Sequence, residues 1–403
     1  MTVTNPPAST AKTPITLLAG MAVASPVALN IFAPVMPELA QRFDTTPFTI
    51  QLGFTLYLLT LAVGQLISGP LADRYGRRPV LIWGFLLHVV GCLVGALAVE
   101  VWQLLLARVL QAAGGCTGML LARSIVLDQH GKDKAAGMLG YITLGIASAQ
   151  ALAPTVGGYL NIAVGWQSVF WVSMVFGSLV WLGALFYLPE TAKQDDKKAS
   201  FFQTFGRYSE VLSSRSYLWF ALSSTLIASG FFIFITSAPF VVSEFLKGNS
   251  ADYGNWFLLV AGGFWLGSLT AGKISAGQGT DRMIMSGHML SAVGAVLMLG
   301  WMFFSDISYL ALFLPMALFT FGRGLSQPSA QSAAVSSARG AIATATGFQG
   351  FIQLIVGAGM AQIAPMLMAI HISLLPVILI MLSVLAVVTY RLGASTTAAK
   401  AAL

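Results

Sequence analysis

Charged side chains that could act together stand in one short segment, "GPLADRYGRRPV", which begins at Gly69. Asp73 can accept hydrogen bonds, and Arg77 can pair with a carboxylate elsewhere in the chain. We expect that carboxylate to be Asp128, in "ARSIVLDQ". Gly69 would let two helices approach closely, and Gly76 would shape a turn. Residues of these types are suited to an ion pair that can form and break, and not to covalent chemistry.

Three further polar side chains, Arg108, Gln111 and His88, lie inside apolar segments. Arg108 is deep in one of them, where a charge costs about 2.5 to 3.5 kcal/mol on insertion scales. Gln111 is one helical turn away, so both side chains can face a shared cavity. His88 could carry protons, because histidine titrates near neutral pH. The alternatives are an arginine that bonds backbone carbonyls only for packing and a histidine that is an ordinary satisfied polar residue.

Aromatic and amide side chains in the apolar segments are candidates for binding an uncharged part of a small molecule. The candidates are Asn30, Tyr57, Phe231, Phe234, Gln349 and Gln353, beside Arg108 and Gln111. An amide that faced lipid would leave its donors unsatisfied, so the amides are the stronger candidates. Ordinary packing is the alternative for each phenylalanine. Such a lining suits amphipathic, largely neutral molecules.

The composition identifies a membrane protein. Of 403 residues, 57% are hydrophobic and 9% are charged, whereas soluble domains carry roughly 25% charged residues. The net charge of +7 comes from short loops, where membrane topology explains it better than a nucleic-acid partner. Cys92 and Cys116 lie in apolar segments, so we expect no disulfide, metal or cofactor. The sequence has neither a Walker-type phosphate loop nor the clustered ligands of a membrane enzyme.

Apolar runs long enough to cross a bilayer follow one another along the chain. We predict twelve membrane-spanning helices at 15–37, 48–71, 80–99, 101–122, 136–161, 166–188, 217–240, 253–275, 284–304, 308–328, 343–369 and 371–391. An even number of spans puts both termini on one side. Of the 21 lysines and arginines, all except Arg42, Lys247 and Arg108 are assigned to loops or tails on the side of the termini. Arg323 is among those assigned to that side. This asymmetry predicts cytoplasmic termini.

A charged segment after the sixth span divides the chain into two halves. We predict an N-terminal tail at 1–14, a six-helix bundle at 15–188, a cytoplasmic linker at 189–216, a second six-helix bundle at 217–391 and a C-terminal tail at 392–403. The segment "GQLISGPLADRYGRR" has a weak counterpart in "GFWLGSLTAGKISAGQGTDR" in the second half. Two six-span halves are typical of transporters that rock between two orientations.

The loop "GPLADRYGRRPV" resembles the signature loop between spans two and three of the major facilitator superfamily, and it falls between those predicted spans here. The resemblance implies a cytoplasmic latch that holds the two halves together in the outward-open state. Its expected residues are Gly69, Asp73, Gly76, Arg77, Arg78 and Asp128. The alternative is that the arginines only fix the topology of the loop.

Other motifs narrow the resemblance. "RVLQAAGG" resembles the Arg-x-x-Gln-Gly pattern of span four, with Ala112 in place of its glycine. "GIASAQALAPTVGG" resembles the span-five motif of exporters and antiporters, with Gly145, Pro154, Gly157 and Gly158 in place. Across residues 15–391 the chain is similar to the twelve-span drug:proton antiporters of the Bcr/CflA type, which implies multidrug efflux.

The chain departs from this family at the end of the first span. Related exporters have a pattern like Asp-x-Tyr-x-Pro there, whereas "LNIFAPVMPE" places Asn30 at the position of the acid. Glu38 follows at the outer end, where we expect it to be solvated. Three accounts of coupling stay open. In the first, protons couple through Asp73 and Asp128 or through His88, and the resemblance adds Arg108 as a candidate. In the second, the substrate itself carries the proton. In the third, transport is not coupled to protons.

The expected function is therefore secondary active export of small amphipathic drugs from the bacterial cytoplasm across the inner membrane, by alternating access and in exchange for protons. The alternative is export of a metabolite such as a sugar or an amino acid by the same fold. The expected partners are the substrate, protons and the lipid bilayer. One chain can hold a complete transport pathway, so we expect a monomer. We also expect that the protein is not an enzyme.

Overall fold

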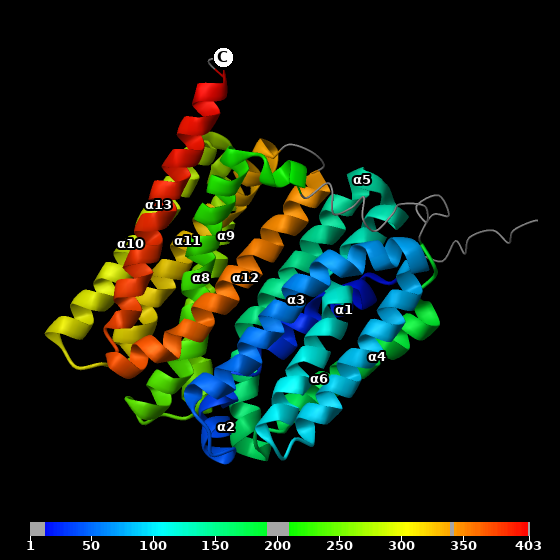
Figure 1. Ribbon diagram of the computed structural model, residues 1–403, viewed down its shortest axis with the longest axis horizontal. Coiled ribbons are helices and arrows are strands. Elements are labelled where there is room, and N and C mark those ends of the chain that lie inside the picture. The colour runs from blue at the N-terminus through cyan, green and yellow to red at the C-terminus, as the bar shows by residue number, and fades with distance from the viewer. Residues whose placement is uncertain (1–12, 192–208, 339–341, 402–403) are drawn as a thin grey trace, which may run out of the picture.

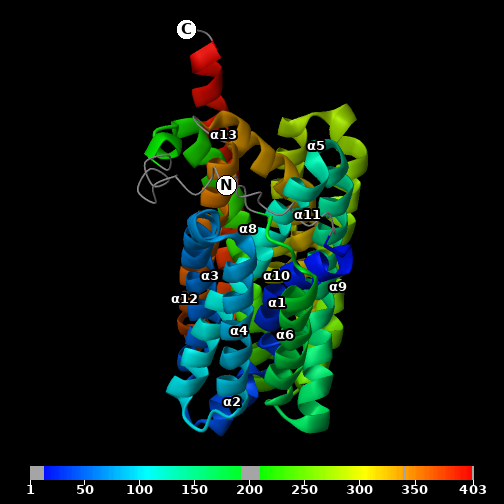
Figure 2. The ribbon, with the colours of Figure 1, turned by 90° about the vertical axis from the view of Figure 1, so that its right-hand side faces the viewer.

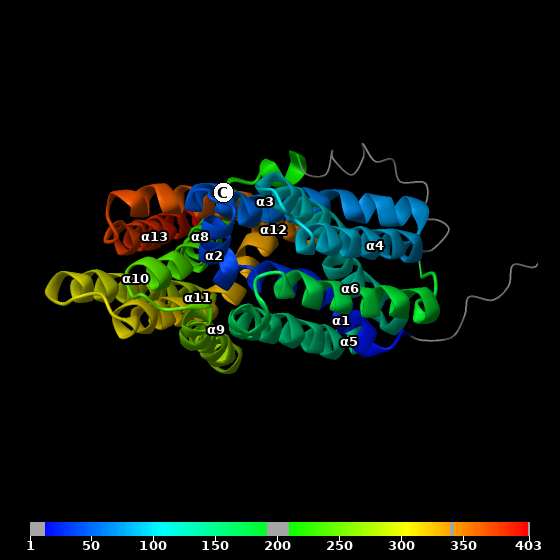
Figure 3. The ribbon, with the colours of Figure 1, turned by 90° about the horizontal axis from the view of Figure 1, so that it is seen from below.

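The computed structural model describes residues 13–191, 209–338 and 342–401, which contain twelve helices long and apolar enough to cross a membrane. The helices form two groups side by side, one from each half of the chain (Figure 1, Figure 3). The described ranges hold no strand. The predicted all-α membrane fold, with twelve spans in two six-helix bundles, is confirmed. The tail predicted at 1–14 and the linker predicted at 189–216 lie mostly outside the described residues.

The N-terminal bundle follows the predicted spans with two differences. Its elements are α1 (Ile15–Asn30), η1 (Ala33–Val35), α2 (Met36–Arg42), α3 (Pro47–Tyr75), α4 (Arg77–Ala96), α5 (Val101–Val164) and α6 (Ser168–Tyr187). The first predicted span is broken, because Pro34 and Pro37 lack the N–H groups that a continuous helix needs. The helical backbone of α5 continues through the expected connection and contains two spans, Val101–His130 and Gly137–Val164.

The C-terminal bundle has one helix for each predicted span. Its helices are α8 (Arg215–Glu244), α9 (Ser250–Gln278), α10 (Thr280–Phe304), α11 (Tyr309–Ser337), α12 (Ile342–Ile370) and α13 (Leu374–Ala401). The last helix continues beyond the predicted end of the span at 391, so most of the predicted C-terminal tail is helical. The described part of that tail has no proline, and alanines follow its single glycine, Gly393.

The same turn appears at corresponding places in the two bundles. Gly76 stands directly before α4 with a φ of 97°, and Gly279 stands directly before α10 with a φ of 80°. Residues other than glycine rarely adopt this left-handed backbone conformation. The two turns fall within the weakly similar segments of the two halves. The structure thus relates the signature loop to its degraded counterpart.

The helices after these turns also cross their neighbours in the same way. A Cβ on Gly84 of α4 would lie 3.1 Å from the carbonyl oxygen of Gly114 on α5. A Cβ on Gly287 of α10 would lie 2.5 Å from the carbonyl oxygen of Gly322 on α11. Both crossings leave no room for side chains. This is the small-residue packing by which membrane helices associate, since lipid gives them little hydrophobic drive.

Hydrogen bonds join the two bundles in the half of the molecule away from the termini. Gln51 of α3 donates to the carbonyl oxygen of Thr236 at 2.7 Å, and Thr55 donates to Gln362 of α12 at 2.7 Å. On the other flank, Thr155 of α5 donates to a carbonyl oxygen of α9 at 2.7 Å. Figure 2 shows α2, which belongs to this half, at the opposite end from the end of α13. We call this half the closed side.

We predict that Gly287→Val lowers the thermal stability of the purified protein, because the added side chain collides with α11. Overpacking of this kind costs about 1 to 3 kcal/mol. Gly300→Val on the same helix is the matched control, since a Cβ there meets no atom within 4 Å. Unfolding followed by fluorescence in detergent should show a lower melting temperature for the first variant alone. Equal melting temperatures would contradict the packing argument.

Candidate functional site

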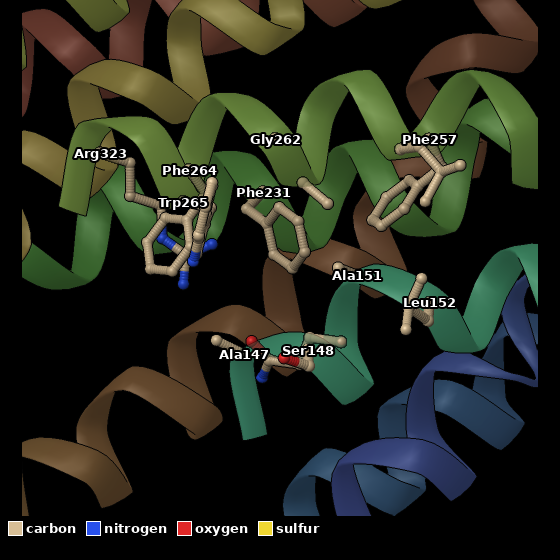
Figure 4. Close-up of a pocket in the computed structure, with 13 residues that line it drawn as sticks. Ala147, Ser148, Ala151, Leu152, Phe231, Phe257, Gly262, Phe264, Trp265 and Arg323 are labelled. Carbon is tan, nitrogen blue, oxygen red and sulfur yellow. The ribbon is translucent and has the colours of Figure 1, made fainter. Parts of the chain in front are cut away.

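A cavity of about 290 Å³ lies between the two bundles at the middle of the membrane-spanning helices. Figure 4 shows α5 of the N-terminal bundle on one side and helices of the C-terminal bundle on the other. The wall formed by α5 is made of Ala147, Ser148, Gln150, Ala151 and Leu152. The facing wall is made of Phe231, Phe257, Leu258, Ala261, Gly262, Phe264, Trp265 and Arg323. The cavity is therefore mostly apolar and aromatic, with a single charged residue.

That residue, Arg323, lies in the middle of α11, between Tyr309 and Ser337. Its guanidinium carbon stands 4.6 Å from the ring centre of Phe231 and 5.0 Å from that of Phe264. Such distances give cation–π attraction. The placement of Arg323 in a loop that sets topology, as predicted from the sequence, is wrong, because α11 continues to Ser337. Its position within the predicted span 308–328 was the signal that could have identified it as a buried charge.

A second cavity of about 490 Å³ adjoins the first and leads away from the closed side. The two share Ala147, Phe264 and Trp265 as lining residues. The second cavity adds Thr143, Ser268, Gln327 and Gln331 to the lining, together with Leu144, Leu269 and Pro328. The two cavities together give the bundle interface a hollow that begins at mid-membrane and continues toward the side of the termini.

Arg108, in contrast, is enclosed within the N-terminal bundle and is 1% exposed. One terminal nitrogen donates to the carbonyl oxygen of Ala28 at 2.9 Å and to the side chain of Gln111 at 2.8 Å. The guanidinium carbon stands 4.1 Å from the ring centre of Tyr57 and 4.4 Å from that of Phe32. The other terminal nitrogen is buried without a hydrogen-bond partner among the described residues, and the side chain lines neither cavity.

Other predicted residues extend this cluster across four helices. The hydroxyl of Tyr57 and the Ser25 side chain share a hydrogen bond of 2.9 Å. Gln111 donates to the sulfur of Cys92 at 3.1 Å, and its carbonyl oxygen lies 2.9 Å from Nδ1 of His88. The His88 side chain is fully buried. The cluster ties α1, α3, α4 and α5 together, and roles for its members in binding or proton transfer stay predictions.

Two of the three predicted amides form hydrogen bonds within their own bundles. Asn30 donates to the carbonyl oxygen of Pro26, one turn earlier on α1, at 2.7 Å. Gln349 donates to Ser224 at 3.0 Å. The amide nitrogen of Gln353 is buried and has no hydrogen-bond partner among the described residues. These positions make the three amides parts of the helix packing in this conformation.

The two predicted phenylalanines differ in their surroundings. Phe231 lines the first cavity, where it contacts the guanidinium of Arg323. Phe234 is fully buried and packs edge-on against Phe313, with ring centres 5.6 Å apart. Of the residues proposed to bind substrate, Phe231 is the one that reaches the cavity between the bundles.

The signature loop forms a charged cluster within the N-terminal bundle. Arg77 of α4 and Asp128 of α5 form an ion pair. Glu190, which is not among the residues predicted from the sequence, accepts hydrogen bonds from the backbone nitrogens of Arg77 at 2.9 Å and of Arg78 at 3.2 Å. Its carboxylate therefore caps the start of α4, where the helix dipole favours negative charge. The "LPET" segment after the sixth span was the available signal.

The remaining latch glycines differ in how tightly they are packed. A Cβ on Gly76 would lie 2.9 Å from the carboxyl carbon of Glu190, so this glycine makes room for the cap. A Cβ on Gly69 would lie no closer than 3.9 Å to Leu120. Asp73 is exposed near the end of α3. The packing thus requires a glycine at position 76 more strongly than at position 69.

The predicted antiporter motif lies where α5 meets α1 and α9. A Cβ on Gly157 would lie 2.5 Å from the carbonyl oxygen of Ile31. Gly158 packs against the backbone of Ser250, whose hydroxyl donates to the Gly158 carbonyl oxygen at 3.0 Å. Gly145 lies nearer the side of the termini and is less crowded, with Val23 at 3.3 Å from a Cβ placed there. The motif supplies the close contact between the bundles.

Pro154 belongs to the same contact, because its carbonyl oxygen would lie 2.8 Å from a Cβ on Gly254 of α9. Nearby, Asn161 donates hydrogen bonds to Glu38 and to the side chain of Ser250, the latter at 3.2 Å. We expected Glu38 to be solvated, and it is indeed exposed, yet its carboxylate also joins this network across the closed side.

Comparison with known proteins agrees with the fold. The family model of the Major Facilitator Superfamily matches residues 18–361. The chain also resembles a structure of a bacterial homologue of the human lysosomal transporter Spinster, solved inward-facing and unoccupied. The TM-score is 0.71 at 15% identity, covering 95% of this chain and 96% of the other. The chain belongs to the Major Facilitator Superfamily.

Curated relatives match the chain at low sequence identity. The chain is 28% identical to an uncharacterized MFS-type transporter of Bacillus subtilis, over 62% of this chain and 64% of the relative's length. It is 24% identical to the multidrug transporter MdfA of Yersinia pestis, over 84% and 83%. It is 25% identical to a bicyclomycin resistance protein homologue of Haemophilus influenzae, over 58% and 59%. The protein is thus a multi-pass membrane transporter for a small molecule.

We predict that Arg108→Met destabilises the N-terminal bundle, because it leaves the Ala28 carbonyl oxygen and the Gln111 side chain without their charged donor. An unsatisfied buried acceptor costs about 1 to 3 kcal/mol. Arg282→Met, at an exposed position, is the control. Thermal unfolding in detergent should separate the two variants by several degrees. A melting temperature equal to that of the control would argue against this structural role.

Proposed function

We propose that the protein exports small amphipathic compounds across the bacterial inner membrane by alternating access between its two bundles. One observation carries the proposal: an aromatic hollow lies between the bundles at mid-membrane, closed on one side by inter-bundle hydrogen bonds and continued toward the other. Sites of this kind at the interface of two repeats are typical of secondary transporters. The multidrug transporter among the relatives supports drugs as the substrate class.

The direction of transport follows from the proposed orientation. With cytoplasmic termini, the closed side faces outward and the hollow continues toward the cytoplasm. A substrate would enter from the cytoplasm or the inner leaflet and leave after the contacts between α5 and α9 separate. The glycines of the span-five motif keep that contact close, which supports their place in a gate.

We propose that export is driven by exchange for protons. Acidic side chains of the described spans stand at span ends, so coupling would use the charged cluster at the signature loop. The ion pair of Arg77 with Asp128 would weaken on protonation of the carboxylate, since a neutral acid loses its Coulomb attraction. Asp73, His88 and Arg108 are the other proposed coupling residues. The pair lies within one bundle, so the proposed latch would act by holding α4 against α5.

The decisive experiment measures accumulation of a panel of drugs in bacteria that lack their own pumps. Expression should lower accumulation of amphipathic drugs. Ala147→Trp should return accumulation nearly to the level of cells without the transporter, because the indole fills the space shared by both cavities. Ala163→Trp, exposed on the same helix, is the control at matched protein level. Export that survives Ala147→Trp would refute this site.

Proton coupling is tested in proteoliposomes with an imposed pH gradient. We expect the gradient to drive substrate movement, and Asp128→Asn to reduce the gradient-driven rate severalfold because it removes the carboxylate of the ion pair. Asp306→Asn, exposed on the closed side, should leave the rate unchanged. Transport that ignores the gradient would sink the antiport proposal. A normal rate in Asp128→Asn would remove this cluster from the coupling mechanism.

A further inference from the structure

We propose that Arg323 binds the anionic head group of the substrate, so the site prefers amphipathic organic anions with an aromatic or otherwise apolar body over neutral or cationic compounds. This rests on the proposed function, because it specifies the substrate class of the same cavity. It differs from the largely neutral substrates expected from the sequence, in which Arg323 was placed in a loop.

The charge of Arg323 is incompletely satisfied by the protein. Its Nε donates to Gln327, one turn later on α11, at 2.8 Å. Its terminal nitrogens form no hydrogen bond with any residue in the described ranges, and no described carboxylate forms an ion pair with it. The linings of the two cavities contain no aspartate or glutamate. A charge held at mid-membrane is costly, so it is normally paired or used.

Arg108 differs from Arg323 in its partners and in its access to the cavities. The terminal nitrogen of Arg108 bonds a backbone carbonyl and a glutamine within one bundle, and the side chain is 1% exposed. Arg323 has the aromatic contacts but lacks the carbonyl partner, and it lines a cavity that faces the other bundle. The arrangement leaves its bidentate fork available for an anion.

The walls around Arg323 define the rest of the ligand. Phe231 and Phe264 hold the guanidinium plane, and Trp265 lies next to Phe264 with 49% of its surface exposed. Figure 4 shows these rings facing Ala147 and Ser148 of α5 across the cavity. The small side chains of α5 leave space for a planar body between the bundles. An occupant would therefore contact both bundles, with its anionic end at α11.

The test uses three probes that share one apolar body. Naphthalene-2-sulfonate is anionic, 2-naphthylmethanol is neutral, and a naphthylmethyl-trimethylammonium salt is cationic. Binding to the full-length protein is measured by calorimetry in nanodiscs of phosphatidylcholine. We expect the sulfonate to bind at least about tenfold more tightly than the other two, the size of one charge-assisted hydrogen bond. Equal affinities for the three probes in the wild-type protein would overturn the proposal without any mutation.

Variants then assign the preference to one side chain. Arg323→Gln should remove the preference for the sulfonate while leaving the neutral probe unchanged, and Arg323→Lys should retain part of it. Arg282→Gln, exposed on α10, is the matched control. A sulfonate preference that survives Arg323→Gln would place the anion site elsewhere and overturn the assignment.

Two further comparisons distinguish a lipid anion from a dissolved one, and a failure of the charge preference from a failure of export. Short-chain phosphatidylglycerol is added as a competitor: displacement of the sulfonate identifies a lipid head group as an occupant of the anion site, and no displacement restricts the site to solutes. Arg323 is required in either case.

If drugs are exported but the charge preference is absent, the inference fails and the proposed function stands. If the preference is present but no compound is exported, the proposed function alone fails.

Discussion

Polar groups inside the bilayer must find partners within the protein, and this requirement shapes the whole molecule. Helices in lipid gain little from hydrophobic burial against one another, so they associate through close backbone contact and buried hydrogen bonds. The glycine crossings of α4 with α5 and of α10 with α11 supply the first. The cluster around Arg108 supplies the second, because it joins four helices through one charge. These contacts tie the helices of each bundle to one another.

The interface between the bundles is built differently. On the closed side, short polar side chains such as Thr55 and Thr155 reach carbonyl or amide groups of the other bundle. Toward the middle, the contact gives way to aromatic rings and small residues that enclose a hollow. Single hydrogen bonds of this type contribute only about 0.5 to 1.5 kcal/mol each, so a modest number would let the proposed gate both close and separate. The positive charge of Arg323 at this hollow would attract an anion.

Much of the fold follows from the sequence. Apolar runs of about 20 residues fix the spans, because a helix of that length crosses the hydrocarbon core. The signature loop identified the superfamily, and the choice of Asp128 as the partner of Arg77 matches the ion pair in the structure. The structure differs from the predicted spans at helix ends. Prolines interrupt the helix of the first span, and the last helix continues beyond the predicted end of its own span. Such ends depend on local chemistry that hydropathy does not report.

The sequence by itself determined the number of helices, their pairing into halves and the buried arginine of the first half. The tertiary structure alone decided that Arg108 is enclosed whereas Arg323 lines the hollow, that Glu190 caps α4, and that Asn161 links Glu38 to Ser250. The reason is physical. Helical periodicity tells which residues share a face, but the direction of that face is set by how two bundles, far apart in the chain, pack against each other.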